Sequence, residues 1–281
     1  MPTRRGKTIA LVVGAVAVAV LAVAVWLCWP HLRFWYLFES LGPNAQRYPE
    51  YRHRQTGIIF VRVPGGKFWM GAQAEDPNGQ NYDPEARDNE APVHQVELRP
   101  FLIAKYEVCQ AEWVRVMGSN PAHFKGDDDG PVEQVYWDDI QEFESKTGLR
   151  LPTEAQWEYA CRAKTTTPIA GTGKLDDMGW YDENGGDTTH PVGLKAPNGF
   201  GLHDAHGNVW EWCEDVYDEG FYGKPESAGP DPVSLAGSEA RVFRGGSGVG
   251  VARRCRSSDR CWSPPAGRSP GLGFRPAAPV P

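Results

Sequence analysis

The chain has 281 residues, enough for one large domain or two small ones. Its formal net charge is −7 at pH 7, and no basic run occurs beyond Arg4, Arg5 and Lys7 near the N-terminus. Because phosphate contacts need clustered lysine and arginine, this balance argues against a nucleic-acid partner. The 32 Gly, 24 Pro and 11 Trp residues are typical of a packed domain with many turns and little regular structure.

Residues 8–29 form an almost wholly apolar run without a charged side chain. As a helix rising about 1.5 Å per residue, this run would span roughly 33 Å, enough to cross a bilayer core. The basic residues before it place residues 1–7 in the cytoplasm and the main domain in the periplasm or outside the cell. A cleaved signal peptide is the alternative, but the run is too long for an ordinary one. We therefore expect a single-pass membrane protein with an uncleaved transmembrane helix.

The cysteines bear on the redox state of the predicted external domain. Outside the cytoplasm disulfide bonds can form, and one cysteine, Cys28, lies in the predicted membrane helix. The other five are Cys109, Cys161, Cys213, Cys255 and Cys261. Because their number is odd, at least one is free or pairs with another chain. None of them forms a CxxC motif, which argues against a zinc ribbon.

We interpret residues 30–56 as a juxtamembrane linker, because residues 38–56 are polar and contain two prolines, while Phe34, Trp35 and Tyr36 before them are typical of an aromatic belt at the membrane surface. The main domain is predicted at residues 57–281. It begins with a strand that breaks at Pro64-Gly65-Gly66 and resumes through residues 68–70. An acidic loop at residues 72–91 follows, and then "VHQVELRPFLIAKYEV" predicts a second pair of strands.

Three helices are predicted in the middle of the chain. In the first, Val108, Ala111, Val114 and Met117 are spaced for one apolar face. Two more lie within residues 131–163, and the last opens with Thr153 three residues before Gln156, which is a capping-box pattern. Beyond residue 164 there is little periodicity. A few helices beside many short strands and long loops predict an α+β fold.

Several separate stretches of the sequence then coincide with one family. "FVRVPGGKFWMG", "RLPTEAQWEYACRA", "GFGLHDAHGNVWEW", "RVFRGGS" and "GLGFRPA" occur in this order over almost the entire predicted external domain. Together they resemble the formylglycine-generating enzyme, or sulfatase-modifying factor, family. The resemblance implies a loop-rich variant of the C-type lectin fold, in agreement with the α+β prediction.

The resemblance also implies a test of activity. In the family's catalysts, two cysteines after a Gly-Gly-Ser segment bind copper and oxidise a sulfatase cysteine to formylglycine, and soft thiolates suit Cu(I). Counted from Ser247, the family's two cysteine positions are Gly250 and Cys255 in this sequence. Because the first cysteine is missing, we do not expect copper. Cys255, Cys261 and Ser247 remain as candidate catalytic residues.

Two interpretations of Cys255 stay open. It could form a rearranged metal pair with Cys261, six residues further on. Alternatively, the resemblance implies a disulfide bond between Cys161 and Cys255, because family members link the cysteine of "EYACRA" to one near the "RCR" segment. We expect the disulfide bond, and a bonded Cys255 could not bind copper.

The resemblance further implies a structural calcium ion at "HDAHGNVWEW". Its ligands would be the side chains of Asp204 and Glu211 and the main-chain carbonyls of Gly207 and Val209, all hard oxygen donors. Alternatively, the two carboxylates only form hydrogen bonds or salt bridges within the turn. His203 lies in the same stretch, but without an HExxH motif it is expected to be a hydrogen-bonding group.

Three functions follow from these observations. The first, which we prefer, is a membrane-tethered binding or assembly subunit that works with other protein subunits or a cell-surface ligand and is not an oxidase. The second is a sulfatase-maturing oxidase. The third is another enzyme with an anion-binding cluster of Ser247, Arg254, Arg256 and Arg260, since guanidinium groups bind anions well. Burial of these arginines in salt bridges would remove the third possibility.

Overall fold

The computed structural model describes residues 29–281, so the predicted membrane span at residues 8–29 lies outside the described residues apart from Trp29. The chain divides into two units, of which the first is described from Trp29 to Glu39 and contains a helix at residues 29–37. Trp29, Leu32 and Tyr36 on this helix are each more than half exposed. Within residues 29–281, no helix is both long and apolar enough to cross a membrane.

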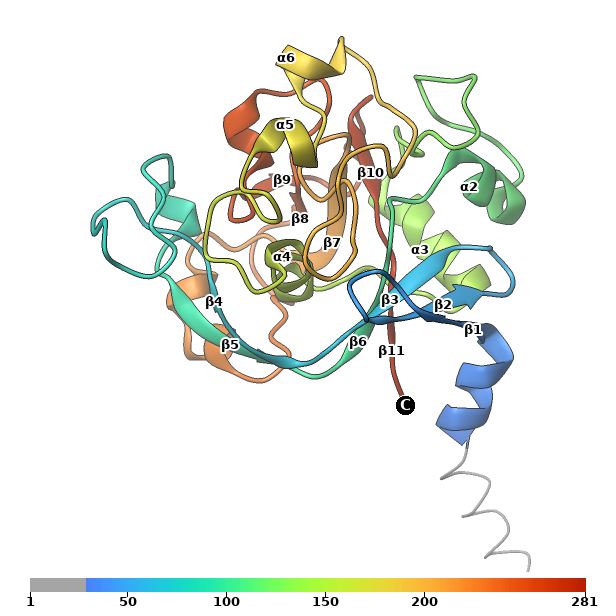
Figure 1. Ribbon diagram of the computed structural model, residues 1–281, viewed down its shortest axis with the longest axis horizontal. Helices are drawn as coiled ribbons and strands as arrows, with labels where there is room; N and C mark the ends of the chain where they lie inside the picture. The colour runs from blue at the N-terminus through green and yellow to red at the C-terminus, as the bar shows by residue number, and fades with distance from the viewer. Residues whose placement is uncertain (1–28) are drawn as a thin grey trace, which may run out of the picture. The chain divides into compact units, whose positions relative to one another are not determined.

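The second unit, Ser40–Val280, is built on a five-stranded sheet with the strand order β1-β2-β3-β6-β11 (Figure 1). Its strands are β1 (Phe38–Pro43), β2 (Pro49–His53), β3 (Ile59–Val63), β6 (Phe101–Ala104) and β11 (Ala277–Pro279). The expected linker at residues 30–56 therefore differs from the structure, because β1 and β2 belong to the sheet. The polar composition that indicated a linker reflects strands that bury few side chains.

The strand predictions from the first part of the domain are confirmed. The chain turns between β3 and β4 (Gly66–Met70), and β4 pairs with β5 (His94–Leu98) as a separate two-stranded ribbon. Strand β6 buries all four of its residues, since it lies in the middle of the large sheet between β3 and β11.

A four-stranded sheet with the order β10-β7-β8-β9 carries the segments of most interest. Its strands are β7 (Trp210–Val216), β8 (Arg241–Arg244), β9 (Cys261–Ser263) and β10 (Leu272–Phe274). Strand β10 runs parallel to β7, and the other pairs are antiparallel. In this sheet Cys261 lies opposite Phe243, on the edge strand β9.

Helix α2 (Gln110–Met117) forms where a helix is expected, but its predicted buried face is wrong. Val114 is exposed, whereas Trp113 is buried against Phe143 and Phe274. Its indole ring stacks on Phe143 with the ring centroids 5.6 Å apart. A single aromatic side chain reaching across to the helix α3 (Trp137–Thr147) thus sets the orientation of α2 more than the row of smaller apolar residues.

Helix α4 (Glu154–Arg162) lies in the middle of the large unit and contacts β4, β7 and β8 (Figure 1). The predicted capping box is confirmed, because the Gln156 backbone N–H donates to Thr153 Oγ1 and the Thr153 N–H donates to Gln156 Oε1. Nearly every residue of α4 is buried, including Glu154, Glu158 and Arg162.

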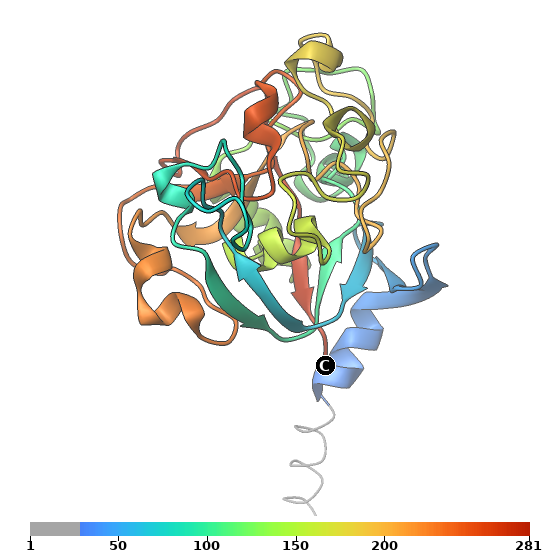
Figure 2. The same cartoon turned by 60° about the vertical axis from the view of Figure 1, so that its left-hand side comes forward.

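The remaining elements are short. They are η1 (Asp88–Glu90), α5 (Leu175–Met178), α6 (Asp182–Gly185), η2 (Phe221–Gly223), η3 (Pro225–Ala228) and η4 (Ala252–Cys255). Figure 2 shows how loops and one-turn helices cover the part of this unit away from the large sheet. The predicted α+β, loop-rich character is therefore confirmed for the described part of the chain.

Candidate functional site

The segment after Gly-Gly-Ser borders a cavity of about 360 Å³. Gly250 and Cys261 line this cavity, but Cys255 does not. Cys255 is fully buried at the end of η4, where a Cβ atom added to Gly246 would lie 2.5 Å from its sulfur. The structure therefore places Cys261 in the cavity wall and Cys255 in the protein interior. The side chains lining the cavity are Trp210, Phe243, Val251, Arg254, Cys261, Ser269 and Leu272.

The ionisation of these two thiols bears directly on metal binding. Burial raises the pKa of Cys255 to about 12. Burial also raises the pKa of Cys261, although the nearby Arg254 guanidinium acts in the opposite direction. Each thiol would therefore have to release its proton on binding copper or another soft metal, because such metals bind the thiolate. The third candidate, Ser247, is buried, and its hydroxyl lies beside the backbone of Gly250 and Gly271.

The expected Cys161–Cys255 bond is not formed in this structure, in which both cysteines are free thiols. They lie on either side of the buried His206 ring. The Cys161 sulfur is 3.6 Å from His206 Nε2, and His206 Nδ1 is 2.7 Å from the Cys255 carbonyl oxygen. Burial lowers the pKa of His206 to about 4, so the ring is neutral and serves as a hydrogen-bonding group.

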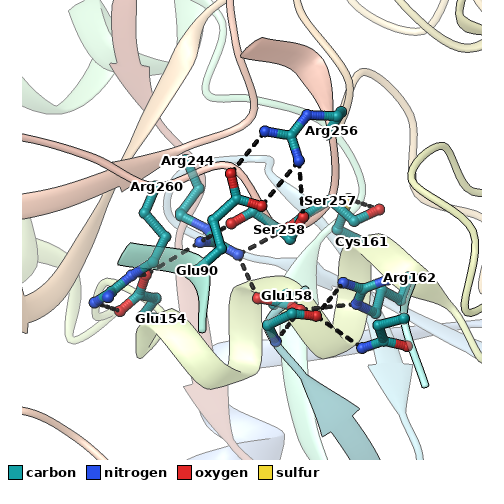
Figure 3. Close-up of polar contacts among 12 residues, drawn as sticks. Glu90, Glu154, Glu158, Cys161, Arg162, Arg244, Arg256, Ser257, Ser258 and Arg260 are labelled. Carbon is teal, nitrogen blue, oxygen red and sulfur yellow. Dashed lines mark hydrogen bonds and ion pairs between the residues drawn. The ribbon is translucent and has the colours of Figure 1, made fainter. Parts of the chain in front are cut away.

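A buried network of ion pairs occupies the arginines of the C-terminal segment (Figure 3). Glu154 binds Arg260 through both of its oxygens, at 2.6 and 2.8 Å. Glu158 accepts from Arg244 at 2.5 Å and from Arg162 at 2.8 Å. Although burial alone would raise the pKa of Glu158, these two guanidinium groups lower it. The network ties helix α4 to strand β8 and to residues 256–260.

This network rules out the proposed anion-binding cluster. Arg256 is buried, and its two terminal nitrogens bind Asp83 at 2.7 Å and Glu90 at 2.6 Å. Arg260 is buried against Glu154 in the same way. Guanidinium groups that are already neutralised by buried carboxylates have no donors left for a substrate anion. Arg254 is partly exposed; it shares Asp259 with Arg256, at 3.4 Å from its own Nη1, and it lines the cavity.

A second buried cluster surrounds the predicted calcium ligands. Glu211 is fully buried, and both of its oxygens bind Arg275, while its Oε2 also accepts from Trp157 Nε1 at 2.7 Å. Asp204 accepts from the Gly193 N–H at 2.6 Å through Oδ2, but its other oxygen, Oδ1, is buried without a partner. Glu107 accepts from the backbone and side chain of the turn at residues 208–209.

The charges in this cluster do not balance. Three buried carboxylates, those of Glu107, Asp204 and Glu211, face one guanidinium, that of Arg275. Burial, followed by repulsion from the other two carboxylates, raises the pKa of Glu107 well above its usual range. Burial raises the pKa of Asp204 to about 6. Within residues 29–281, no three His, Cys, Asp or Glu side chains converge on one metal position. Of the predicted calcium ligands, Asp204 thus keeps one buried oxygen without a partner, whereas both oxygens of Glu211 are bound to Arg275 or Trp157.

Sequence reasoning missed Glu107 and Arg275. Each is a charged residue within or directly after an apolar stretch, "FLIAKYEV" and "GLGFRPA", and each is fully buried. A buried charge must be paired with an opposite charge or a hydrogen-bonding group. A charged residue in an apolar stretch is therefore a sequence signal that could have identified Glu107 and Arg275 as members of a buried cluster.

Comparison with known proteins agrees with this arrangement. Residues 45–279 match the family model of the sulfatase-modifying factor enzyme 1-like domain. The chain belongs to this family. The match begins before β2, so this sulfatase-modifying factor domain starts earlier than the expected residue 57.

Individual relatives extend the comparison. The formylglycine-generating enzyme of Streptomyces coelicolor is 31% identical over 76% of this chain and 87% of its own length. The inactive C-alpha-formylglycine-generating enzyme 2 of Bos taurus is 25% identical over 86% of this chain and 95% of its own. Among solved structures, Treponema denticola variable protein 1 superposes with a TM-score of 0.69 at 27% identity, covering 82% of this chain and 99% of its own. The family match therefore covers every strand of the second unit except β1, which precedes residue 45.

Proposed function

We propose that this protein is a membrane-tethered, extracytoplasmic sulfatase-modifying factor domain that acts as a binding or assembly subunit and not as a copper-dependent oxidase. One observation carries the proposal: neither position of the family's cysteine pair offers a usable thiol. Gly250 has no side chain, and Cys255 is buried with its thiol pKa raised to about 12. Since Cu(I) in such a site would be held by two thiolates, a chain with glycine at the first position lacks one of the two ligands.

The cavity supports a binding role. It lies beside Gly250, the position at which the family's catalysts have their first cysteine. Two aromatic side chains, Trp210 and Phe243, line it. A fold can retain its ligand-binding surface after a catalytic group is lost, because the function of a fold depends on its site. One relative, in Bos taurus, is itself named as an inactive form of the enzyme.

The first unit supports the membrane tether. The apolar run at residues 8–29 leads directly into the helix at residues 29–37. On that helix Trp29, Leu32 and Tyr36 are exposed, and Trp and Tyr are favoured where a membrane helix leaves the bilayer. The proposed topology is tested by protease treatment of intact cells. Residues 40–280 should be digested only from the extracytoplasmic side, and release of the protein by alkaline carbonate would contradict the anchor.

The proposal includes one structural calcium ion. Asp204 and Glu211 would hold it with the carbonyls of Gly207 and Val209, and the buried Asp204 Oδ1 that lacks a partner supports this assignment. Calcium prefers such oxygen ligands. Its two positive charges would offset the excess of buried carboxylates, so its role would be to hold the turn between residues 204 and 211.

The experiment that tests the proposed function is an oxidation assay on the full chain. The detergent-purified protein is supplied with Cu(I), oxygen and a cysteine peptide of the sulfatase type, and aldehyde formation is followed by mass spectrometry. We expect none, while the Streptomyces coelicolor enzyme serves as the positive control. The variant Gly250→Cys is expected to stay inactive too, because its intended partner Cys255 is buried. Aldehyde formed by the unmodified chain would refute the proposal.

A further inference from the structure

The cavity beside Gly250 has apolar walls. The rings of Trp210 and Phe243 meet edge to face with their centroids 5.1 Å apart, and Leu272 and Val251 complete the apolar lining. A Cβ added to Gly250 would lie 3.0 Å from the Ser247 hydroxyl oxygen, so glycine at this position keeps the wall close to Ser247. Apolar and aromatic walls of this kind favour a flat or branched hydrocarbon group.

One charged side chain, Arg254, is among the residues that line this cavity. Its side chain is 27% exposed, and its ion pair with Asp259 is long, at 3.4 Å. Asp259 is shared with Arg256 and Arg87, at 3.3 and 3.8 Å. Arg254 therefore differs from Arg256, whose terminal nitrogens are taken up by short pairs. The Arg254 guanidinium also opposes the rise that burial causes in the pKa of Cys261, another residue of the cavity wall.

We propose that this cavity binds an apolar carboxylate, with the hydrocarbon part against Trp210 and Phe243 and the carboxylate against the Arg254 guanidinium. The inference rests on the proposed function, since it assigns a ligand class to the binding role. A largely apolar wall with a single guanidinium, the neutral side chains of Cys261 and Ser269, and no acidic residue matches an apolar group that carries one negative charge. A free acid and the C-terminal residue of a peptide share this chemistry.

Because Cys261 lines the cavity, the alkylation rate of its thiol can be used to measure ligand binding there. The full chain in mild detergent is treated with iodoacetamide at pH 8.5, and alkylation of Cys261 is measured by peptide mass spectrometry. 3-Phenylpropanoate should slow this alkylation at concentrations at least about tenfold lower than its neutral amide, because only the acid gains a charge-assisted hydrogen bond. Cys109 is partly exposed and lies at the start of α2, so its alkylation rate should not change.

Variants assign the effect to the cavity. Arg254→Gln should remove the preference for the acid over the amide, whereas Arg253→Gln, at an exposed neighbour outside the cavity, should keep it. Val251→Trp should fill the cavity and abolish protection by both compounds, which provides a test that does not depend on Arg254. Equal protection by acid and amide, no protection by either, or an unchanged preference in Arg254→Gln would each overturn the proposal.

Two further measurements distinguish a peptide terminus from a small acid as the ligand, and failure of the ligand proposal from failure of the proposed function. A short peptide that ends in phenylalanine is compared with the same peptide carrying a C-terminal amide. If the free-acid peptide protects Cys261 at a lower concentration than 3-phenylpropanoate does, the ligand is a chain terminus. Protection by 3-phenylpropanoate alone would identify a small acid. Aldehyde formation in the oxidation assay would remove the proposed function, while Cys261 protection judges the ligand class separately.

Discussion

Arg244 and Glu158 form an ion pair in which neither side chain is exposed to solvent, with Nη2 and Oε2 2.5 Å apart. Arg244 comes from strand β8 and Glu158 from helix α4, so the pair joins the four-stranded sheet to the central helix. Arg244 also donates to the Ser257 and Ser258 carbonyls. One side chain thereby holds three segments that are far apart in the sequence.

Replacement of Arg244 should therefore be severely destabilising. We expect Arg244→Met to lower the free energy of unfolding by about 3–5 kcal/mol, because buried carboxylates lose a partner without gaining water. Urea denaturation measures the change. Lys146→Met is the control, because Lys146 pairs with Glu142 at the surface and such pairs contribute about 0–1 kcal/mol. Similar losses in the two variants would contradict the role given to the buried pair.

The cap of helix α4 gives a second prediction. Thr153→Ala removes the oxygen that accepts from the Gln156 N–H, and we expect a loss of about 1 kcal/mol in unfolding free energy. The exposed Thr166 supplies the control, since Thr166→Ala should change stability by less than about 0.5 kcal/mol. An unchanged midpoint for Thr153→Ala would show that other contacts set the start of the helix.

Glu112 predicts a pH dependence of stability. Burial raises its pKa to about 7, against the ordinary value of 4.5. Between pH 4.5 and 7 the unfolded chain loses the Glu112 proton while the folded chain keeps it, so stability falls as pH rises through this window. Glu112→Gln stays neutral and should avoid this loss, which we expect to be about 1–3 kcal/mol.

The measurement for Glu112 is the difference in unfolding free energy between the native protein and Glu112→Gln from pH 4 to 8.5. Other titrating groups cancel in this difference because both proteins contain them. The difference should change between pH 4.5 and 7 and be level above pH 7.5. A difference that is independent of pH would contradict the assignment.

The proposed calcium ion predicts an effect of metal removal. A chelator should lower the thermal unfolding midpoint of the native protein, and calcium should restore it. At 100 times the dissociation constant, the gain is about 2.7 kcal/mol. Asp204→Ala should lose this response, whereas Asp182→Ala, at an exposed carboxylate, should retain it. If calcium leaves the native midpoint unchanged, the proposed site does not bind it.

Local patterns predicted the elements that local interactions determine. The Thr153–Gln156 capping box and the break after β3 depend on residues within a few positions of one another, and both are confirmed. The roles of Arg256 and Arg260 could not be predicted in this way. Their partners Glu90 and Glu154 precede them by more than a hundred residues, so only the folded chain brings them together.

The edges of the domain were harder to predict for a related reason. Strand β2 exposes or half-exposes most of its side chains, so its sequence lacks the alternation that marks a strand, and its hydrogen bonds to β3 define it instead. The buried face of α2 was mispredicted because Trp113 packs against Phe143 on another helix. In the site, the resemblance alone indicated that Gly250 occupies the position of the family's first cysteine. Only the structure showed that Cys261 lines the cavity while Cys255 is buried away from it.

The last strands, β10 and β11, are separated by only two residues, yet they complete different sheets. Strand β11 closes onto β6, and β10 closes onto β7. During synthesis, neither sheet can reach its final strand order until its last strand, β10 or β11, has left the ribosome. A chain that stopped before Ala277 would therefore lack β11, which pairs with β6, and one that stopped before Leu272 would also lack β10, which pairs with β7. Two sheets thus depend on one short segment, and a quality-control protease that recognises incomplete domains would have a clear signal.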